Sequence, residues 1–180
     1  MPYSDAELVK IMASQEEELR WARFTEEDAW TLGTEIRSLF VSRKEAQVEG
    51  YSGTSIVISI SLFNGHILFQ TAVGPGATPD NWNWVKGKTA TVKRYGHSSF
   101  YIGRQAAAKG PEGTAKLLKY APEMEFVAHG GAVPIFIEGL GSQPIGAVVV
   151  SGLVQAYDHQ LVVDGMRAVI KSAEKSSVIG

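Results

Sequence analysis

The chain has 180 residues, of which 44% are hydrophobic and 20% are charged, an ordinary globular composition. Its 17 basic and 19 acidic residues give a formal net charge of −2, which argues against the basic surface that nucleic-acid binding requires. The absence of cysteine excludes disulfides, thiolate catalysis, iron–sulfur clusters and zinc sites built on sulfur.

The N-terminal residues do not resemble a targeting segment. They are acidic and lack the apolar stretch of a secretory signal. No part of the sequence approaches the roughly 20 apolar residues that a membrane-spanning helix needs. We therefore expect a cytoplasmic protein with no membrane insertion and no nucleic-acid partner.

Two helices are predicted in the first 50 residues. The first covers residues 5–20, with Glu16, Glu17 and Glu18 on its outer side. The second begins after Thr25, a good N-cap followed by three acidic residues that the helix dipole favours. Its apolar residues recur at helical spacing: Ala29, Leu32, Ile36, Leu39 and Phe40.

Residues 54–73 predict a β-hairpin, because two apolar, β-branched segments flank Asn64-Gly65. A two-residue type I′ turn would place Leu62 opposite Ile67. The face expected to join the core carries Ile58, Ile60, Leu62, Ile67 and Phe69. The opposite face is half polar, so it is wet, covered by a helix or lining a pocket. It carries Ser59, Ser61, Phe63, His66, Leu68 and Gln70.

The second half predicts further helices and another hairpin. A long helix is expected over 80–104, after Thr78 and Pro79, and a short one over 111–120. A second hairpin follows at about 132–152, with its turn at 139–142. The last helix begins near Asp158, which we interpret as its N-cap. Two hairpins require an antiparallel sheet, so we predict an α+β fold with four or five antiparallel strands flanked by helices.

The sequence lacks the standard motifs of hydrolases, kinases, nucleotide-binding proteins and zinc proteases. None of the histidines at 66, 97, 129 and 159 has metal-pair spacing, so we predict no metal-ion site on protein ligands. Nothing identifies a nucleophile or a poised base, so the sequence leaves open whether the protein is an enzyme.

Two groups of residues are candidates for ligand binding. On the long helix, Lys88 and Thr91 lie one turn apart, and Lys93 and His97 lie one turn apart further on. They form either a solvated basic face or a cationic rim for a carboxylate or phosphate. The second group is His129 with Gly130 and Gly131. Glycines there allow close backbone approach, and their N–H groups could form an anion-binding nest, or the segment is a plain loop before a strand.

Four segments in order resemble the GlcG/HbpS-like family of haem-binding and haem-degrading domains, more narrowly its uncharacterised branch. They are the hairpin around 55–70, KGKTATVKRYGHSS, HGGAVPIFIEG, and IGAVVVSG followed by DHQLVVDGM. The resemblance covers roughly residues 25–172, and the IGAVVVSG segment is the most specific part of it. Thr89 and Val92 stand where the family helix motif has alanines.

The resemblance implies a profilin-like domain that assembles into a homo-oligomer and binds haem noncovalently. Lys88 and Thr91 match the family helix motif, whereas Lys93 and His97 are candidates from the helix itself. We divide the chain into a helical N-terminal extension (1–24), the domain (25–172) and a mobile tail (173–180). Two alternatives stay open: a non-catalytic oligomeric adaptor for protein partners, using Glu16–Glu18 and exposed tryptophans, and a small organic-anion binder using the 129–131 loop.

Overall fold

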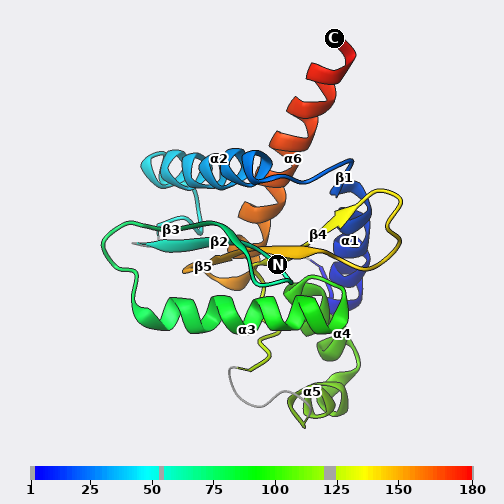
Figure 1. Cartoon of the computed structure of the whole chain (residues 1–180). Coiled ribbons are helices and arrows are strands. Elements are labelled where there is room, and N and C mark those ends of the chain that lie inside the picture. The colour runs from blue at the N-terminus through cyan, green and yellow to red at the C-terminus, as the bar shows by residue number, and fades with distance from the viewer. Residues whose placement is uncertain (1–2, 53–54, 120–124, 180) are drawn as a thin grey trace.

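The structure is a computed structural model, and it describes residues 3–52, 55–119 and 125–179 (Figure 1). A five-stranded sheet forms its centre, in the order β1-β4-β5-β2-β3. The strands are β1 (Arg20–Trp21), β2 (Ile56–Leu62), β3 (Ile67–Val73), β4 (Ala132–Ile137) and β5 (Gly146–Ser151). The predicted α+β fold and mostly antiparallel sheet are confirmed. Among the strands of the described residues, only the short edge strand β1 runs parallel to its neighbour, β4.

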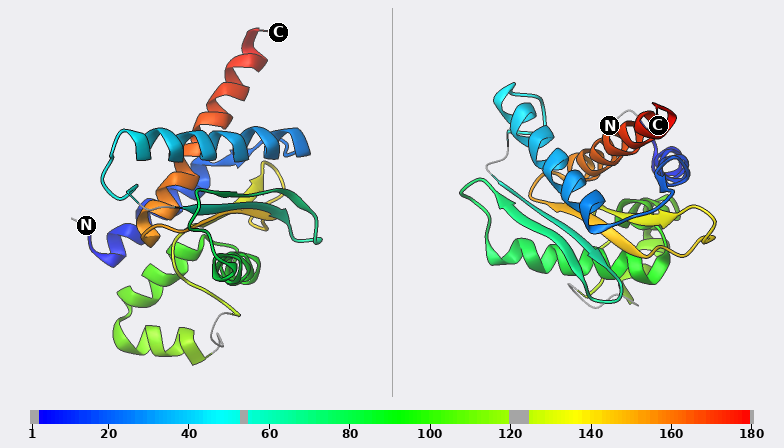
Figure 2. Two further views of the ribbon diagram at one scale, coloured as in Figure 1. Left: turned by 90° about the vertical axis from the view of Figure 1, so that its left-hand side faces the viewer. Right: turned by 45° about the horizontal axis from the view of Figure 1, so that its top comes forward.

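Helices cover both faces of the sheet (Figures 1 and 2). The helices α2 (Glu26–Glu45) and α6 (Gln155–Ile179) pack on one face, and α3 (Pro79–Tyr95) packs on the other. The remaining helices are α1 (Asp5–Glu18), α4 (Ser99–Ala108) and α5 (Gly110–Lys119). Within the described residues, no helix is both long enough and apolar enough to cross a membrane.

The alternation of side chains along the strands supplies both layers of the core. Ile58 and Ile60 face α2 and α6, where they are fully buried with Leu32 and Leu161. The intervening Val57 points to the opposite face and packs in a second cluster, under α3. The predicted second helix is confirmed: Thr25 caps α2 and forms a capping box with Asp28.

The hairpin is confirmed, but its predicted turn is wrong. Ile58 pairs with Thr71 and Ile60 with Phe69 as expected, and then the register shifts so that Ser61, not Leu62, faces Ile67. A type I′ turn needs positive φ at both central residues, and Asn64 has none, whereas Gly65 has φ 102°. The shift leaves Ile67 60% exposed instead of in the core.

The long helix predicted over 80–104 is two helices. Gly96 adopts a left-handed conformation with φ 69°, and its N–H bonds to the carbonyl of Val92, which ends α3. Ser98 then caps α4 by accepting a hydrogen bond from the N–H of Tyr101. Consequently His97 lies in the connection between the helices and not on a continuous basic face.

The C-terminal helix starts earlier than predicted. It begins at Gln155, so Asp158 lies inside its first turn and is not an N-cap. The helix extends to Ile179 and projects away from the body of the molecule (Figure 1). The mobility of residues 173–180 stays a prediction.

Candidate functional site

A buried ion pair joins α3 to α6. The Lys88 ammonium lies 3.0 Å from the Asp158 carboxylate, and both side chains are 2% exposed. Lys88 also donates to the carbonyl of Val150 at 3.0 Å, and Asp158 accepts from the backbone N–H of Leu153 at 2.9 Å. Burial lowers the pKa of Lys88 and raises the pKa of Asp158, because a low-dielectric interior disfavours both charges. The polar contacts oppose that effect.

Gly131 is a glycine because the chain passes directly over this pair. Its φ is 125°, which side chains disfavour. A Cβ there would lie 2.3 Å from the carbonyl oxygen of Val150 and 2.6 Å from the Lys88 ammonium nitrogen. The neighbouring Gly130 donates its N–H to the side chain of Gln155 at 3.3 Å. That donor is therefore engaged within the protein, which weakens the predicted anion nest.

His129 lies beside the pair with its ring against Trp84. The ring centroids are 5.2 Å apart and the planes meet at 84°, an edge-to-face contact. Burial is the main cause that lowers the pKa of His129, and the positive charges of Lys88 and Arg104 add to it. The imidazole is therefore neutral at pH 7 and has a nitrogen lone pair that can bind a metal.

These residues line a cavity of about 230 Å³, which we call the His129 pocket. Its lining comes from α3, the 129–131 segment, the end of β5 and the start of α6. The members are Asn81, Trp84, Lys88, His129, Ser151, Gly152, Leu153, Gln155 and Asp158. The pocket combines one neutral imidazole, one compensated ion pair, several polar groups and an indole ring.

Of the seven predicted site residues, Lys88, His129, Gly130 and Gly131 come together here. Thr91 does not join them. Its buried hydroxyl lies 3.1 Å from the carbonyl of Gly87 and 3.0 Å from that of Val127. Thr91 thus anchors the segment before residue 129 to α3.

Lys93 and His97 also lie elsewhere. Lys93 donates to the carbonyl of Phe63 at 3.2 Å, at the hairpin turn. His97 pairs through Nδ1 with Glu16 at 2.6 Å and stacks on Tyr101. The hydrogen bond to Glu16 raises the pKa of His97. Glu16 is buried, so the expected exposure of Glu16–Glu18 as one acidic surface is wrong at its first residue.

Sequence reasoning missed Asp158, Trp84 and Gln155 as pocket residues. Trp84 lies at the start of the helix predicted over 80–104, where a tryptophan is more often a packing residue than the wall of a pocket. The local pattern around Asp158 suggests a helix cap, and nothing near it indicates a partner 70 positions away. The one feature of the sequence that draws attention to Asp158 is that it begins DHQLVVDGM, the last segment of the family resemblance.

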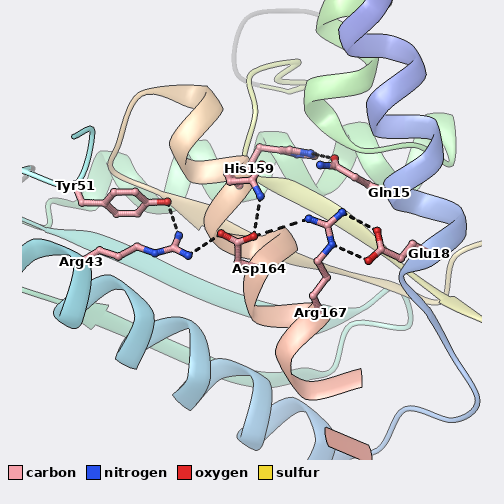
Figure 3. A network of polar contacts seen from close by, with 8 residues as sticks. Gln15, Glu18, Arg43, Tyr51, His159, Asp164 and Arg167 are labelled. Atoms are coloured by element: carbon pink, nitrogen blue, oxygen red, sulfur yellow. Dashed lines mark hydrogen bonds and ion pairs between the residues drawn. The ribbon is translucent and has the colours of Figure 1, made fainter. Parts of the chain in front are cut away.

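Besides the ion pair of Lys88 and Asp158, a network of polar side chains lies along α6 (Figure 3). Asp164 accepts from Arg43 at 2.7 Å, and Arg43 also donates to Tyr51 at 2.7 Å. Arg167 forms a two-point contact with Glu18, at 2.8 and 2.6 Å. The network joins α2, α6 and α1 to one another, so it has a clear structural role.

His159 is buried beside this network and is neutral. Its Nε2 lies 3.0 Å from the side-chain oxygen of Gln15 on α1 (Figure 3). Burial is the main cause that lowers its pKa to about 4.

Fold and pocket together define a mixed α and β domain with a small, partly polar pocket at one end of its sheet. A family model described as "Haem degrading protein HbpS-like" matches residues 24–167. The chain belongs to this HbpS-like family.

Relatives and solved structures agree with this assignment. A UPF0303 protein of Acidobacterium capsulatum is 38% identical over 163 residues, which are 91% of this chain and 90% of that protein. The crystal structure of Ybr137w has a TM-score of 0.76 at 34% identity and covers 92% of this chain and 88% of its own. The relative YBR137W is from Saccharomyces cerevisiae. The crystal structure of HbpS has a TM-score of 0.57 at 19% identity, over 84% of this chain and 92% of its own, and shares the fold.

Proposed function

We propose that this chain binds haem noncovalently, with the imidazole of His129 as the iron ligand and the His129 pocket holding one edge of the macrocycle. The description of the family supports a haem-related role. The observation in this chain that supports it most is the neutral imidazole of His129, which is exposed and borders a pocket beside an indole ring.

The donor type fits haem. Histidine is a common axial ligand of haem iron, and it binds in its neutral form. Among the other histidines, His97 is held in an ion pair that favours its protonated form, and His159 is buried under α1. His129 is therefore better suited to bind iron than His97 or His159.

The His129 pocket is large enough for only part of a haem group. At about 230 Å³ the pocket is smaller than the roughly 300–1,000 Å³ that enclose a drug-sized ligand. One edge of the macrocycle would lie against Trp84 and Leu153, and the rest would lie outside the pocket. When bound, haem supplies an iron centre for redox or oxygen chemistry. The chain's own contribution is the imidazole, an apolar wall and exclusion of water from one side.

A haemin titration tests this proposal. We expect a saturable Soret shift at one haem per chain or fewer, and its loss in His129→Ala. His66→Ala is the matched control, because His66 is an exposed histidine outside the pocket. Serum albumin serves as the standard for nonspecific adsorption. Equal binding by wild type, His129→Ala and His66→Ala would overturn the assignment of the ligand.

The pocket volume favours a second candidate, a small polar molecule. Asn81, Ser151 and Gln155 supply hydrogen-bonding groups, and Lys88 is already compensated by Asp158. A neutral polar molecule therefore suits the pocket better than the organic anion that the sequence suggested. Thermal stabilisation by neutral compounds, lost in Gln155→Ala and absent with haemin, would favour this candidate over haem.

Self-association is part of the proposed function. The edge strand β3 has the sequence ILFQTAV, with no charge and no proline to block pairing. Beside it Trp30 is 63% exposed, with its ring against Phe69. We expect light scattering to show an oligomer that Trp30→Lys weakens. A monomeric wild-type chain would contradict this part, and would also remove support for the oligomeric adaptor.

A further inference from the structure

The middle of the sequence has an uneven charge distribution. From Asn81 to Pro111 there is no aspartate or glutamate, although the whole chain has more acidic than basic residues. The same stretch contains six lysines and arginines: Lys86, Lys88, Lys93, Arg94, Arg104 and Lys109. Like charges on neighbouring elements repel one another, so such a segment is stabilised by an anion wherever several of the cations meet.

Several cations meet in a cavity of about 420 Å³ at the corner where the end of α3, α4 and α5 come together. We call this cavity the corner pocket. Its lining is Arg94, Tyr95, Ile102, Gln105, Ala106, Lys109, Gly113, Lys116 and Leu117. Among the lining residues that the structure describes, three are cationic and none is acidic.

The apolar part of the corner pocket is substantial. Ile102 and Leu117 contribute branched side chains, Tyr95 contributes a ring, and the stems of the lysines add methylene groups. A volume of about 420 Å³ lies within the roughly 300–1,000 Å³ of ordinary small-molecule sites. The pocket therefore offers apolar contact and positive charge together.

The three cationic side chains of the corner pocket differ in their contacts with the rest of the protein. The Arg94 guanidinium lies over two rings, 4.6 Å from the centroid of Phe126 and 5.4 Å from that of Tyr95. Lys109 and Lys116 are exposed, and neither forms an ion pair with any residue in the described part of the chain. Stacking fixes one charge at the wall, while two flexible lysines can close on a bound group.

We propose that the corner pocket binds a small organic anion with an apolar body and a carboxylate or phosphate head. Lys109 and Lys116 hold the head, and Ile102, Leu117 and the Tyr95 ring hold the body. The corner pocket shares no lining residue with the His129 pocket. The proposal is therefore independent of haem binding.

Calorimetric titration of the full chain with octanoate and with phenyl phosphate tests the proposal. We expect at least one of the two anions to bind saturably at one site per chain, and the uncharged analogue octanol to bind at least about tenfold more weakly than octanoate if octanoate binds. The double variant Lys109→Gln/Lys116→Gln should weaken the bound anion by at least about tenfold.

The matched control is Lys10→Gln/Lys86→Gln, which removes the same charge from exposed positions outside the corner pocket. It should change the affinity less than about twofold. Equal weakening by both double variants would mean diffuse attraction to a basic surface and would overturn the proposal. Saturable binding of neither anion would overturn it as well. Haemin binding that depends on His129 should be unaffected by the corner-pocket variant.

Discussion

The ammonium of Lys88 and the carboxylate of Asp158 lie 3.0 Å apart with both side chains 2% exposed, and they connect the helices on opposite faces of the sheet. Removal from water opposes both charges, so each depends on the other. The pair also forms part of the wall of the His129 pocket, because both side chains line it. Packing of the two helices and the shape of the His129 pocket therefore depend on the same two residues.

Removing the charge of one member of the Lys88–Asp158 ion pair should destabilise the folded protein strongly. In Asp158→Asn, the buried ammonium loses its counter-charge, and we expect the free energy of unfolding to fall by about 3–5 kcal/mol. The double variant Lys88→Met/Asp158→Leu replaces the pair by apolar groups and should recover at least about half of that loss. Urea unfolding measures both. A cost below about 1 kcal/mol for Asp158→Asn would mean that water reaches the pair.

Two glycine-to-alanine substitutions distinguish the cost of a steric clash from the cost of backbone strain. In Gly131→Ala, the new methyl group meets the Val150 carbonyl and the Lys88 ammonium, so we expect a loss of about 3 kcal/mol or more, or failure to fold. Gly139 also has positive φ, 77°, but its Cβ would meet open space. Gly139→Ala should cost only about 1–2 kcal/mol. Thermal melting compares them, and equal effects would contradict the contact with Lys88.

Buried His159 should make the protein sensitive to acid. Its pKa in the folded state is about 4, below the ordinary value of 6.5, so between these values only the unfolded chain takes up the proton. Its contribution is fully present above pH 6.5 and decreases as the pH falls toward 4, by about 3 kcal/mol in total. We expect urea unfolding at pH 7, 6 and 5 to show a smaller loss in His159→Asn than in wild type. Parallel pH profiles would show that the imidazole is not buried as described.

The network in Figure 3 predicts unequal effects along its length. Asp164 accepts from Arg43 and Gln160, both at 2.7 Å, in a half-buried position. Asp164→Asn should therefore cost about 1.5–3 kcal/mol. Glu18 is 43% exposed, and Glu18→Gln should cost at most about 1 kcal/mol. Chemical unfolding of both variants measures the two costs. A larger loss of stability in Glu18→Gln than in Asp164→Asn would contradict this ranking.

The parts of the fold that sequence predicted are those with local signals. The hairpin at 54–73 follows from alternation around Asn64-Gly65, and α2 follows from Thr25 and the acidic residues after it. The predicted pairing of Leu62 with Ile67 is wrong. The register shifts between Ile60 and Ser61, and the chain does not form the tight two-residue turn that Asn-Gly favours.

Tertiary contacts explain what sequence did not predict. The edge strand β1 has two residues and no local pattern, and it exists because Arg20 and Trp21 pair with β4. The sequence predicts that His97 lies on a helix with Lys93, but in the structure Glu16 lies against His97, and these two residues are 81 positions apart. The break at Gly96 did have a local signal, since glycine commonly ends helices.

The most direct test of His129 as the iron ligand is chemical rescue of the haemin spectrum. In ferric haemin complexes of wild type and His129→Ala, we expect histidine ligation in resonance Raman and electron paramagnetic resonance spectra only for wild type. Added imidazole should restore a wild-type-like spectrum in the variant. Histidine ligation that persists in His129→Ala without imidazole, or no specific complex in wild type, would contradict the assignment.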